Sequence, residues 1–399
     1  MKYLAKKILR RPYRYLRGNK DLTLYYIKHK RTQAHAQKFH TLSLQNKIVF
    51  LNFEGKGYGC NPKYIAEELI KRKFDGEIIW LVKENDPFMP KEIRQVNISG
   101  EDSFRELATA RVIVNNVKGD INFKKRDGQL YIQTWHAGFS PKLLEKDAAI
   151  TLPKSYLLES KYNSEDSDLF LSNSIAQTEE YRRAFWCDCE ILEMGLPRND
   201  IFFHYNSKLK NAILMRIGIN PTKKILMYAP TFRGGVDSLK QYGLDFKLLK
   251  ESIDKKFGGE WVLLVRMHPN VSTLVNSDLE YIDVSKYPDM QDLLLISDIL
   301  ITDYSSSIFD MAEMDKIVFI YANDIEQYQS LRGLKKDFFE LPFSIAEDND
   351  NLRKNIEDFN ETEYKDAVET VKDRYCTFDK GNASEKVVDR IFEWMAKYE

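Results

Sequence analysis

The chain has 399 residues, a length that predicts two or three domains. Hydrophobic residues make up 43% of it, which is enough to fill more than one core. Sixty Lys and Arg side chains balance sixty Asp and Glu side chains. A balanced total argues against a protein that coats nucleic acid with positive charge, so we expect no nucleic-acid partner.

The charged residues are not evenly distributed, because the N-terminal segment is strongly basic. Residues 1–31 contain eleven Lys and Arg and one acid, whereas the other 368 residues contain 49 bases and 59 acids. Apolar Leu4, Ile8 and Leu9 recur at helical spacing among these bases. The pattern predicts a basic helical arm over residues 1–45, which either contacts an anionic membrane surface or packs on the acidic remainder of the chain.

Four cysteines are too few for a disulfide framework in a chain of this length. Cys187 and Cys189 have no Cys or His pair downstream at zinc spacing, so we expect reduced thiols and no structural metal. No apolar run approaches the roughly 20 residues that span a bilayer, and charges interrupt any N-terminal signal sequence. These features predict a cytoplasmic protein.

From residue 47 onward, short apolar runs alternate with helical stretches. Expected strands lie at residues 47–53, 77–82, 111–116, 130–135, 168–173 and 190–195, then at 224–230, 261–269, 298–303 and 317–322. Such runs are typical of parallel sheets that helices cover on both faces. We therefore predict an α/β protein of two doubly wound, Rossmann-like domains facing a cleft, at residues 46–205 and 206–380. Residues 381–399 are predicted to form a helix that packs back on the first domain.

Polar clusters follow four of the expected strands, at the end where parallel sheets bind their ligands. They are His136 after the first of these strands, Arg266 and His268 in the last residues of a second, Arg233 after a third, and Asp303 at the end of a fourth, followed by Ser305, Ser306 and Ser307. Four such coincidences predict a common cleft.

Each cluster has a chemical and a structural interpretation. The serines begin a predicted helix, where free N–H groups form an anion site, although helix capping explains them equally well. Arg266 and His268 lie one residue apart and face the same side of an extended chain, a pairing that suits a diphosphate. His136 is a candidate general base for a hydroxyl, and core packing remains an equal alternative. Gly55 opens a glycine-rich turn without dinucleotide-binding spacing, so we interpret it as a tight turn near an acceptor.

Several short motifs occur in an order that resembles a known family. They are QTWH (133–136), PRND (197–200), YAPTFR (228–233), RMHP (266–269) and ITDYSS (301–306), with GKGYGCNP (55–62), RGL (332–334), ELP (340–342) and GNAS (381–384) in addition. The ordered set spans residues 47–395. It resembles the CDP-glycerol glycerophosphotransferases, the teichoic acid polymerases and primases of Gram-positive cell walls and related capsule enzymes.

The resemblance implies a GT-B-like fold with a CDP-polyol donor in the second domain. It also implies peripheral attachment to the inner face of the cell membrane, because the acceptor is a lipid-linked saccharide or a growing polyol-phosphate polymer. His136 and His268 match the family's catalytic pair. The expected donor-binding residues are Arg266, Asp303, Ser305, Ser306, Ser307, Arg233, Asp310 and Arg332. On the acceptor side we expect Gly55, Trp135, Gly138 and Lys142.

One loop departs from the family pattern. Family members commonly read W-H-G-T followed by P-L-K, whereas residues 135–142 read W-H-A-G-F-S-P-K. The histidine is retained, but the loop that should line the acceptor differs. The choice of glycerol or ribitol, of primase or polymerase, and of wall polymer or capsule therefore stays open.

The implied reaction is attack of an acceptor hydroxyl on the β-phosphate of the donor, with release of CMP. His136 would take the hydroxyl proton, while His268, Arg266 and the serines would stabilise phosphate charge. The main alternative is a GT-B glycosyltransferase that uses a nucleotide sugar, and a further alternative is a non-catalytic binder built around the basic arm. We expect no cofactor. Whether Mg²⁺ accompanies the donor and whether the chain forms a homo-oligomer are left open by the sequence.

Overall fold

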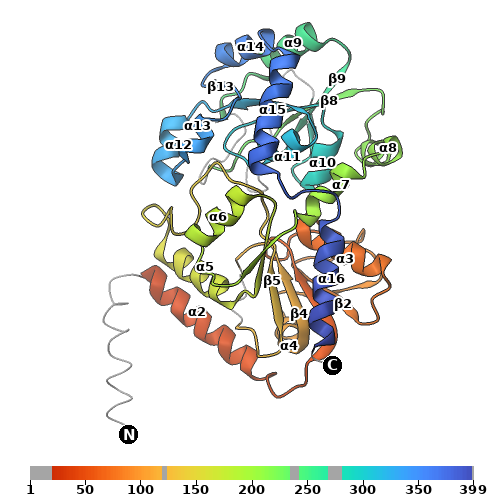
Figure 1. Ribbon diagram of the computed structural model, residues 1–399, viewed down its shortest axis with the longest axis vertical. Helices are drawn as coiled ribbons and strands as arrows, with labels where there is room; N and C mark the ends of the chain where they lie inside the picture. Colours follow the sequence, from red (N-terminus) through yellow and green to blue (C-terminus); the bar gives the residue numbers. More distant parts are fainter. Residues whose placement is uncertain (1–19, 119–123, 234–241, 268–280, 398–399) are drawn as a thin grey trace.

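The computed structural model describes residues 20–118, 124–233, 242–267 and 281–397. Within these ranges the chain forms two parallel β-sheets with helices packed around them (Figure 1). The elements of the first sheet come from the N-terminal half of the chain, and those of the second sheet from the C-terminal half. The predicted α/β class with parallel sheets is thereby confirmed.

The first sheet has seven strands in the order β3-β2-β1-β4-β5-β6-β7. Their bounds are β1 Gln45–Leu51, β2 Glu77–Val82, β3 Ile93–Asn97, β4 Ala110–Asn115, β5 Leu130–Gln133, β6 Leu169–Ser172 and β7 Glu190–Glu193. Six of them match expected strands. β3 was not predicted because this edge strand is only partly buried and most of its residues are polar, so it shows no continuous apolar run.

The second sheet has six strands in the order β10-β9-β8-β11-β12-β13. Their bounds are β8 Lys224–Tyr228, β9 Trp261–Val265, β10 Ile282–Asp283, β11 Ile299–Thr302, β12 Ile317–Tyr321 and β13 Ile345–Ala346. All four expected strands are present. The two additional strands are edge strands of two residues each, too short to carry a recognisable pattern.

Both sheets bury both of their faces. In β1, Ile48 and Phe50 contribute to one hydrophobic core, and Val49 and Leu51 contribute to another on the opposite face. Alternate residues of a strand point to opposite faces, so a strand between two helical layers must be apolar throughout. This requirement explains why the sequence shows continuous apolar runs.

Most helices lie between successive strands, and the last helix returns to the first sheet. Their bounds are α2 Lys20–Gln37, α3 Cys60–Lys71, α4 Glu101–Thr109, α5 Lys154–Asp166, α6 Ile175–Ala184, η1 Pro197–Asn199, α7 Asp200–Phe203, α8 Ser207–Arg216, α9 Phe246–Phe257, α10 Met290–Ile296, α11 Ser307–Glu313, α12 Ile325–Arg332, α13 Lys336–Phe339, α14 Asn349–Glu357, α15 Glu361–Tyr375 and α16 Ala383–Ala396. Val387 and Ile391 of α16 join the core of the first sheet beside α3 (Figure 1). Asp200 fixes the start of α16, because its carboxylate accepts hydrogen bonds from the backbone N–H groups of Ala383 and Ser384.

The predicted basic arm is described only in part, since residues 1–19 lie outside the described ranges. Helix α2 packs beside α4 and α5: its His35 stacks on Phe104 of α4, and its His29 stacks on Tyr162 of α5. Among the helices within the described ranges, none is both long enough and apolar enough to cross a membrane.

Candidate active site

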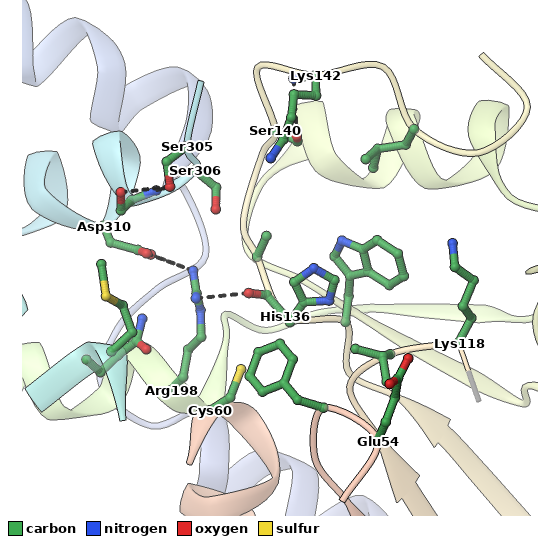
Figure 2. Close-up of a pocket in the computed structure, with 18 of the residues that line it drawn as sticks. Glu54, Cys60, Lys118, His136, Ser140, Lys142, Arg198, Ser305, Ser306 and Asp310 are labelled. Atoms are coloured by element: carbon green, nitrogen blue, oxygen red, sulfur yellow. Dashed lines mark hydrogen bonds and ion pairs between the residues drawn. The ribbon is translucent and has the colours of Figure 1, made fainter. Parts of the chain in front are cut away.

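A cavity of about 460 Å³ lies where the loops of the two sheets meet (Figure 2). One side, which we call the first-sheet wall, is formed by residues that follow the strands of the first sheet: Phe53, Glu54, Lys118, Trp135, His136, Lys142, Glu145, Leu152 and Tyr156. The other side, the second-sheet wall, is formed by Arg266, Asp289, Gln291, Ser305, Ser306, Ser307, Asp310 and Arg332. The carboxyl ends of parallel strands are where such folds bind their ligands.

His136 follows β5 and lies on the first-sheet wall. Its Nδ1 is 3.0 Å from the backbone carbonyl oxygen of Asn116. A carbonyl oxygen only accepts, so Nδ1 carries the proton and Nε2 keeps its lone pair. Burial lowers the pKa of His136 to about 4, and the neighbouring cations of Arg198 and Lys142 add to the shift. The imidazole is therefore neutral at pH 7 and able to accept a proton.

The backbone around His136 is strained. Trp135 has a φ of +53°, which is uncommon for a residue with a side chain. This turn ends β5 at Gln133, two residues earlier than predicted, and carries the chain into the cavity. Phe53, Glu54, Cys60 and Glu145, which also line the cavity, have positive φ as well. Each such residue costs about 1–3 kcal/mol, and strain of this kind clusters at functional sites.

Arg198 joins the two walls. One of its guanidinium nitrogens donates to the backbone oxygen of His136 at 3.1 Å. The other donates to both carboxylate oxygens of Asp310, at 2.7 and 2.9 Å (Figure 2). Burial alone would lower the pKa of Arg198, but the Asp310 carboxylate holds it above its usual value. The pair therefore ties the loop of His136 to α11, the helix that follows the serine cluster.

The second-sheet wall offers hydrogen-bond donors and positive charge. Ser305 and Ser306 are partly exposed in the turn before α11, and the hydroxyl of Ser307 donates to that of Ser305 at 2.9 Å. Arg266 donates to the backbone oxygens of Val284 and Tyr287, at 3.3 and 2.7 Å. These two bonds fix the guanidinium on the cavity wall. Such groups suit the phosphates of a ligand.

Two lysines on the first-sheet wall are desolvated. Burial lowers the pKa of Lys142 to about 8, and it lowers that of Lys118 to about 8 as well. Lys118 donates to Glu145 at 2.7 Å, whereas neither Lys142 nor Arg332 forms an ion pair with any described residue. Lys142 and Arg332 therefore bring uncompensated positive charge to the cavity.

Four of the predicted site residues do not line this cavity. Asp303 accepts from the backbone of Thr231 and pairs with Arg233 at 2.7 Å, and Arg233 also pairs with Asp324. These charges pair with one another after the carboxyl ends of β8, β11 and β12, outside the cavity, and their role in donor binding stays a prediction. Gly55 turns the chain next to Ile98, and a side chain at Gly138 would meet Asn173.

All but one of the remaining predicted residues line the cavity, and the exception lies outside the described residues. The cavity brings together Trp135, His136, Lys142, Arg266, Ser305, Ser306, Ser307, Asp310 and Arg332. Asp310 pairs with Arg198 at 2.7 Å, and its contact with the donor stays a prediction. His268 lies outside the described residues.

Five residues that line the cavity were not predicted from the sequence: Lys118, Glu145, Tyr156, Arg198 and Asp289. Arg198 lies in the quoted PRND motif, and Lys118 follows β4, so the strand-end argument that found His136 could have found both. Glu145, Tyr156 and Asp289 lie in connections whose sequence gives no sign that they return to the cavity.

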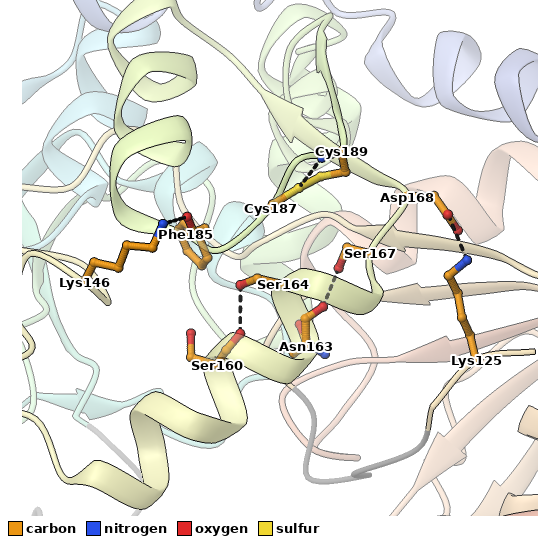
Figure 3. Close-up of a disulfide and its surroundings, with 10 residues drawn as sticks. All are labelled: Lys125, Lys146, Ser160, Asn163, Ser164, Ser167, Asp168, Phe185, Cys187 and Cys189. Atoms are coloured by element: carbon orange, nitrogen blue, oxygen red, sulfur yellow. Dashed lines mark hydrogen bonds and ion pairs between the residues drawn. A yellow bond between two sulfur atoms is a disulfide. The ribbon is translucent and has the colours of Figure 1, made fainter.

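The cysteine expectation was wrong for one pair. Cys187 and Cys189, which lie between α6 and β7, are joined by a disulfide rather than present as reduced thiols (Figure 3). Their Cα atoms are 5.2 Å apart, within the range that a disulfide requires. Among the described residues, no three His, Cys, Asp or Glu side chains gather in a way that could hold a metal ion.

The fold and cavity define a class of protein. Two parallel sheets whose strand ends meet at a cavity, with a histidine on one wall and hydroxyl and guanidinium donors on the other, have the arrangement expected of an enzyme that acts on an anionic ligand. The sequence profile of CDP-glycerol:poly(glycerophosphate) glycerophosphotransferases matches residues 33–393. The chain belongs to this family, as the ordered motifs indicated.

Individual relatives agree with this assignment. The chain is 32% identical over 391 residues to a teichoic acid poly(glycerol phosphate) polymerase of Staphylococcus epidermidis, covering 94% of this chain and 53% of that protein. It therefore spans about half the length of that relative. A polymerase of the same name from Bacillus spizizenii is 31% identical over 361 residues, covering 86% of this chain and 91% of that one. The solved structure of the wall teichoic acid polymerase TagF superposes with a TM-score of 0.81 at 30% identity, covering 96% of this chain and 98% of that one.

Proposed function

We propose that the protein transfers glycerol phosphate or ribitol phosphate from a CDP-polyol to a hydroxyl of a lipid-linked saccharide or growing polyol-phosphate polymer. In this proposal the two sheets belong to two domains of a GT-B-like enzyme, and the cavity between them is the active site. The observation that carries it is the neutral His136, with Nε2 unprotonated, opposite Arg266 and the serines.

The reaction follows from what each wall offers. The acceptor hydroxyl attacks the β-phosphorus of the donor, the bond from that phosphorus to the bridging oxygen breaks, and CMP leaves. His136 takes the hydroxyl proton at Nε2, because Nδ1 is already protonated and held by Asn116. Arg266, Ser305 and Ser306 bind donor phosphate oxygens and stabilise the charge that develops on them. His268 remains assigned as the second catalytic histidine on the resemblance alone.

A donor panel tests this proposal. The protein is incubated with a soluble glycerol phosphate-terminated acceptor and, separately, CDP-glycerol, CDP-ribitol or a UDP-sugar, and the released nucleotide is measured. Release of CMP that depends on the acceptor is expected with at least one CDP-polyol. Release of UDP from a UDP-sugar alone would instead support the glycosyltransferase alternative. Repeating the assay with EDTA determines whether Mg²⁺ accompanies the donor.

The membrane part of the proposal places the protein on the inner face of the cell membrane. Helix α2 exposes Leu24, Tyr26 and Ile27, which are 67%, 40% and 43% exposed, next to the strongly basic N-terminal segment. Apolar and aromatic side chains beside Lys and Arg favour an anionic lipid surface. We expect co-sedimentation with vesicles that contain phosphatidylglycerol and little with phosphatidylcholine alone. Equal sedimentation with both would contradict the charge argument.

A further inference from the structure

The first-sheet wall contains a carboxylate that the proposed reaction does not use. Glu145 is 3% exposed and lines the cavity. One of its oxygens, Oε1, accepts hydrogen bonds from Lys118 at 2.7 Å and from the hydroxyl of Tyr156 at 3.1 Å. The other oxygen, Oε2, has no hydrogen-bond partner among the described residues. A buried carboxylate oxygen is costly to leave without a donor, which indicates that a bound ligand supplies one.

The charges around Glu145 indicate what kind of donor this is. Lys118 and Glu145 form an ion pair, so these two charges balance each other at this corner of the cavity. A phosphate would lie next to the Glu145 carboxylate and be repelled by it. A neutral hydroxyl, in contrast, can donate to Oε2 and complete its hydrogen bonding.

The surroundings of Glu145 also suit a small polyol. Trp135 and Leu152, which are 5% and 8% exposed, line the same cavity and offer apolar surface for the carbon atoms of a ligand. Lys142 and Arg332 line it as well, and neither forms an ion pair with a described residue. The positive charge of Arg332 contributes to the lowered pKa of Lys142, so these two cations lie near each other in the cavity that Glu145 also lines. A neutral diol joined to a phosphodiester matches this pattern of groups.

We propose that Glu145 is the residue that recognises the acceptor end, accepting a hydrogen bond from the hydroxyl next to the attacking one. Lys142 and Arg332 hold the phosphodiester behind that polyol unit. Tyr156 and Lys118 orient the carboxylate through Oε1, which leaves the buried Oε2 without a donor from the described residues. This inference rests on the proposed transferase function, and it assigns a specificity-determining residue to the acceptor half of the cavity.

Two acceptors that differ by one hydroxyl test the proposal in the unaltered protein. One ends in glycerol phosphate and the other in propane-1,3-diol phosphate, which keeps the attacking primary hydroxyl and lacks its neighbour. A lost hydrogen bond to a charged group predicts a kcat/KM about 10- to 100-fold lower for the propanediol acceptor. Equal kcat/KM for the two acceptors would overturn the inference and leave the proposed function intact. Transfer to neither acceptor from any CDP-polyol would overturn both.

A substitution at Glu145 then tests whether this residue causes the preference for the glycerol acceptor. Glu145→Gln keeps the shape of the side chain and removes its charge, so the preference for the glycerol acceptor should fall to about 3-fold or less, while the KM for donor stays within about 2-fold. Glu165→Gln, at an exposed carboxylate of α5, is the matched control and should keep the full preference. An unchanged preference in Glu145→Gln would contradict the assignment. If Glu145→Gln does not fold, Tyr156→Phe replaces it as the test, because it keeps the Glu145 charge and removes one hydrogen bond that orients the carboxylate. Tyr156→Phe should also reduce the preference for the glycerol acceptor. An unchanged preference in that variant would contradict the inference.

Discussion

The two walls of the cavity hold their functional side chains in different ways. On the first-sheet wall, the backbone itself is strained at Trp135 and Glu145, and His136 is fixed by hydrogen bonds at both its ring and its carbonyl oxygen. On the second-sheet wall, Ser305 and Ser306 present partly exposed hydroxyls from an unstrained turn. A reacting hydroxyl must be oriented closely, whereas phosphates need donors and positive charge. The difference fits the proposed reaction, in which His136 of the first-sheet wall aligns the acceptor, and Arg266 and the serines of the second-sheet wall bind the donor.

The largest effect is expected from removing the base on the first-sheet wall. His136→Ala should lower kcat by about 100- to 10,000-fold, the usual contribution of a general base. The dissociation constant of CDP-glycerol, measured by calorimetry, should change by less than about 2-fold, because the donor lies on the other wall. His35→Gln, on α2, is the matched control and should retain full activity. Turnover near that of the unaltered protein in His136→Ala would remove the proposed role of this wall.

The next effect concerns the link between the walls. Arg198→Met leaves the buried Asp310 carboxylate without its partner and should lower the free energy of unfolding by about 3–5 kcal/mol, measured in urea. The double variant Arg198→Met with Asp310→Leu removes both charges and should recover most of that loss, yet it should still transfer more slowly because the carbonyl of His136 is no longer held. Full activity in the stable double variant would show that the link does not position His136.

A smaller effect is expected on the second-sheet wall. Ser305→Ala and Ser306→Ala should each raise the KM for donor by about 10-fold, because each removes one hydrogen bond to a charged phosphate. The KM for acceptor should not change. Ser330→Ala, at an exposed serine of α12, is a control of the same chemistry. If the serine variants instead raised the KM for acceptor, the assignment of the two walls would be reversed.

The smallest effect is a displacement of the pH profile. His136 has a pKa of about 4, so its neutral, proton-accepting form is present above that pH, and kcat/KM should rise as the pH increases through 4. Lys142 has a pKa of about 8, so it loses its positive charge as the pH increases through 8, and kcat/KM should then fall. Lys142→Arg keeps the charge at high pH. It should therefore extend the plateau above pH 8, and an unchanged alkaline limb would exclude Lys142 as its source.

The sequence predicted the second-sheet wall better than the first for a physical reason. Arg266 and the serines lie directly after strands, and the ends of neighbouring parallel strands meet by necessity, so strand prediction alone brings them together. The same argument found His136. Glu145 and Tyr156 lie in the long connection between β5 and β6, where nothing in the local pattern specifies a return to the cavity.

Charge pairing and strand position explain what the sequence alone could not show. Arg233 and Asp303 lie after strand ends as expected, and their opposite charges pair with each other outside the cavity, so their role in donor binding stays a prediction. A strand-end position identifies a candidate, and only the three-dimensional structure shows whether its charge is already satisfied. The edge strands β3, β10 and β13 were missed because strands at an edge are short or half exposed.

The mass of the reaction product tests the central claim most directly. The protein is incubated with CDP-glycerol or CDP-ribitol and a defined lipid-linked acceptor, and the mass of the acceptor is then measured by mass spectrometry. We expect the acceptor to gain one or more whole units of glycerol phosphate or ribitol phosphate, with one CMP released per unit. An unchanged acceptor with both donors, or a gain that corresponds to a sugar without phosphate when nucleotide sugars are supplied, would contradict the claim.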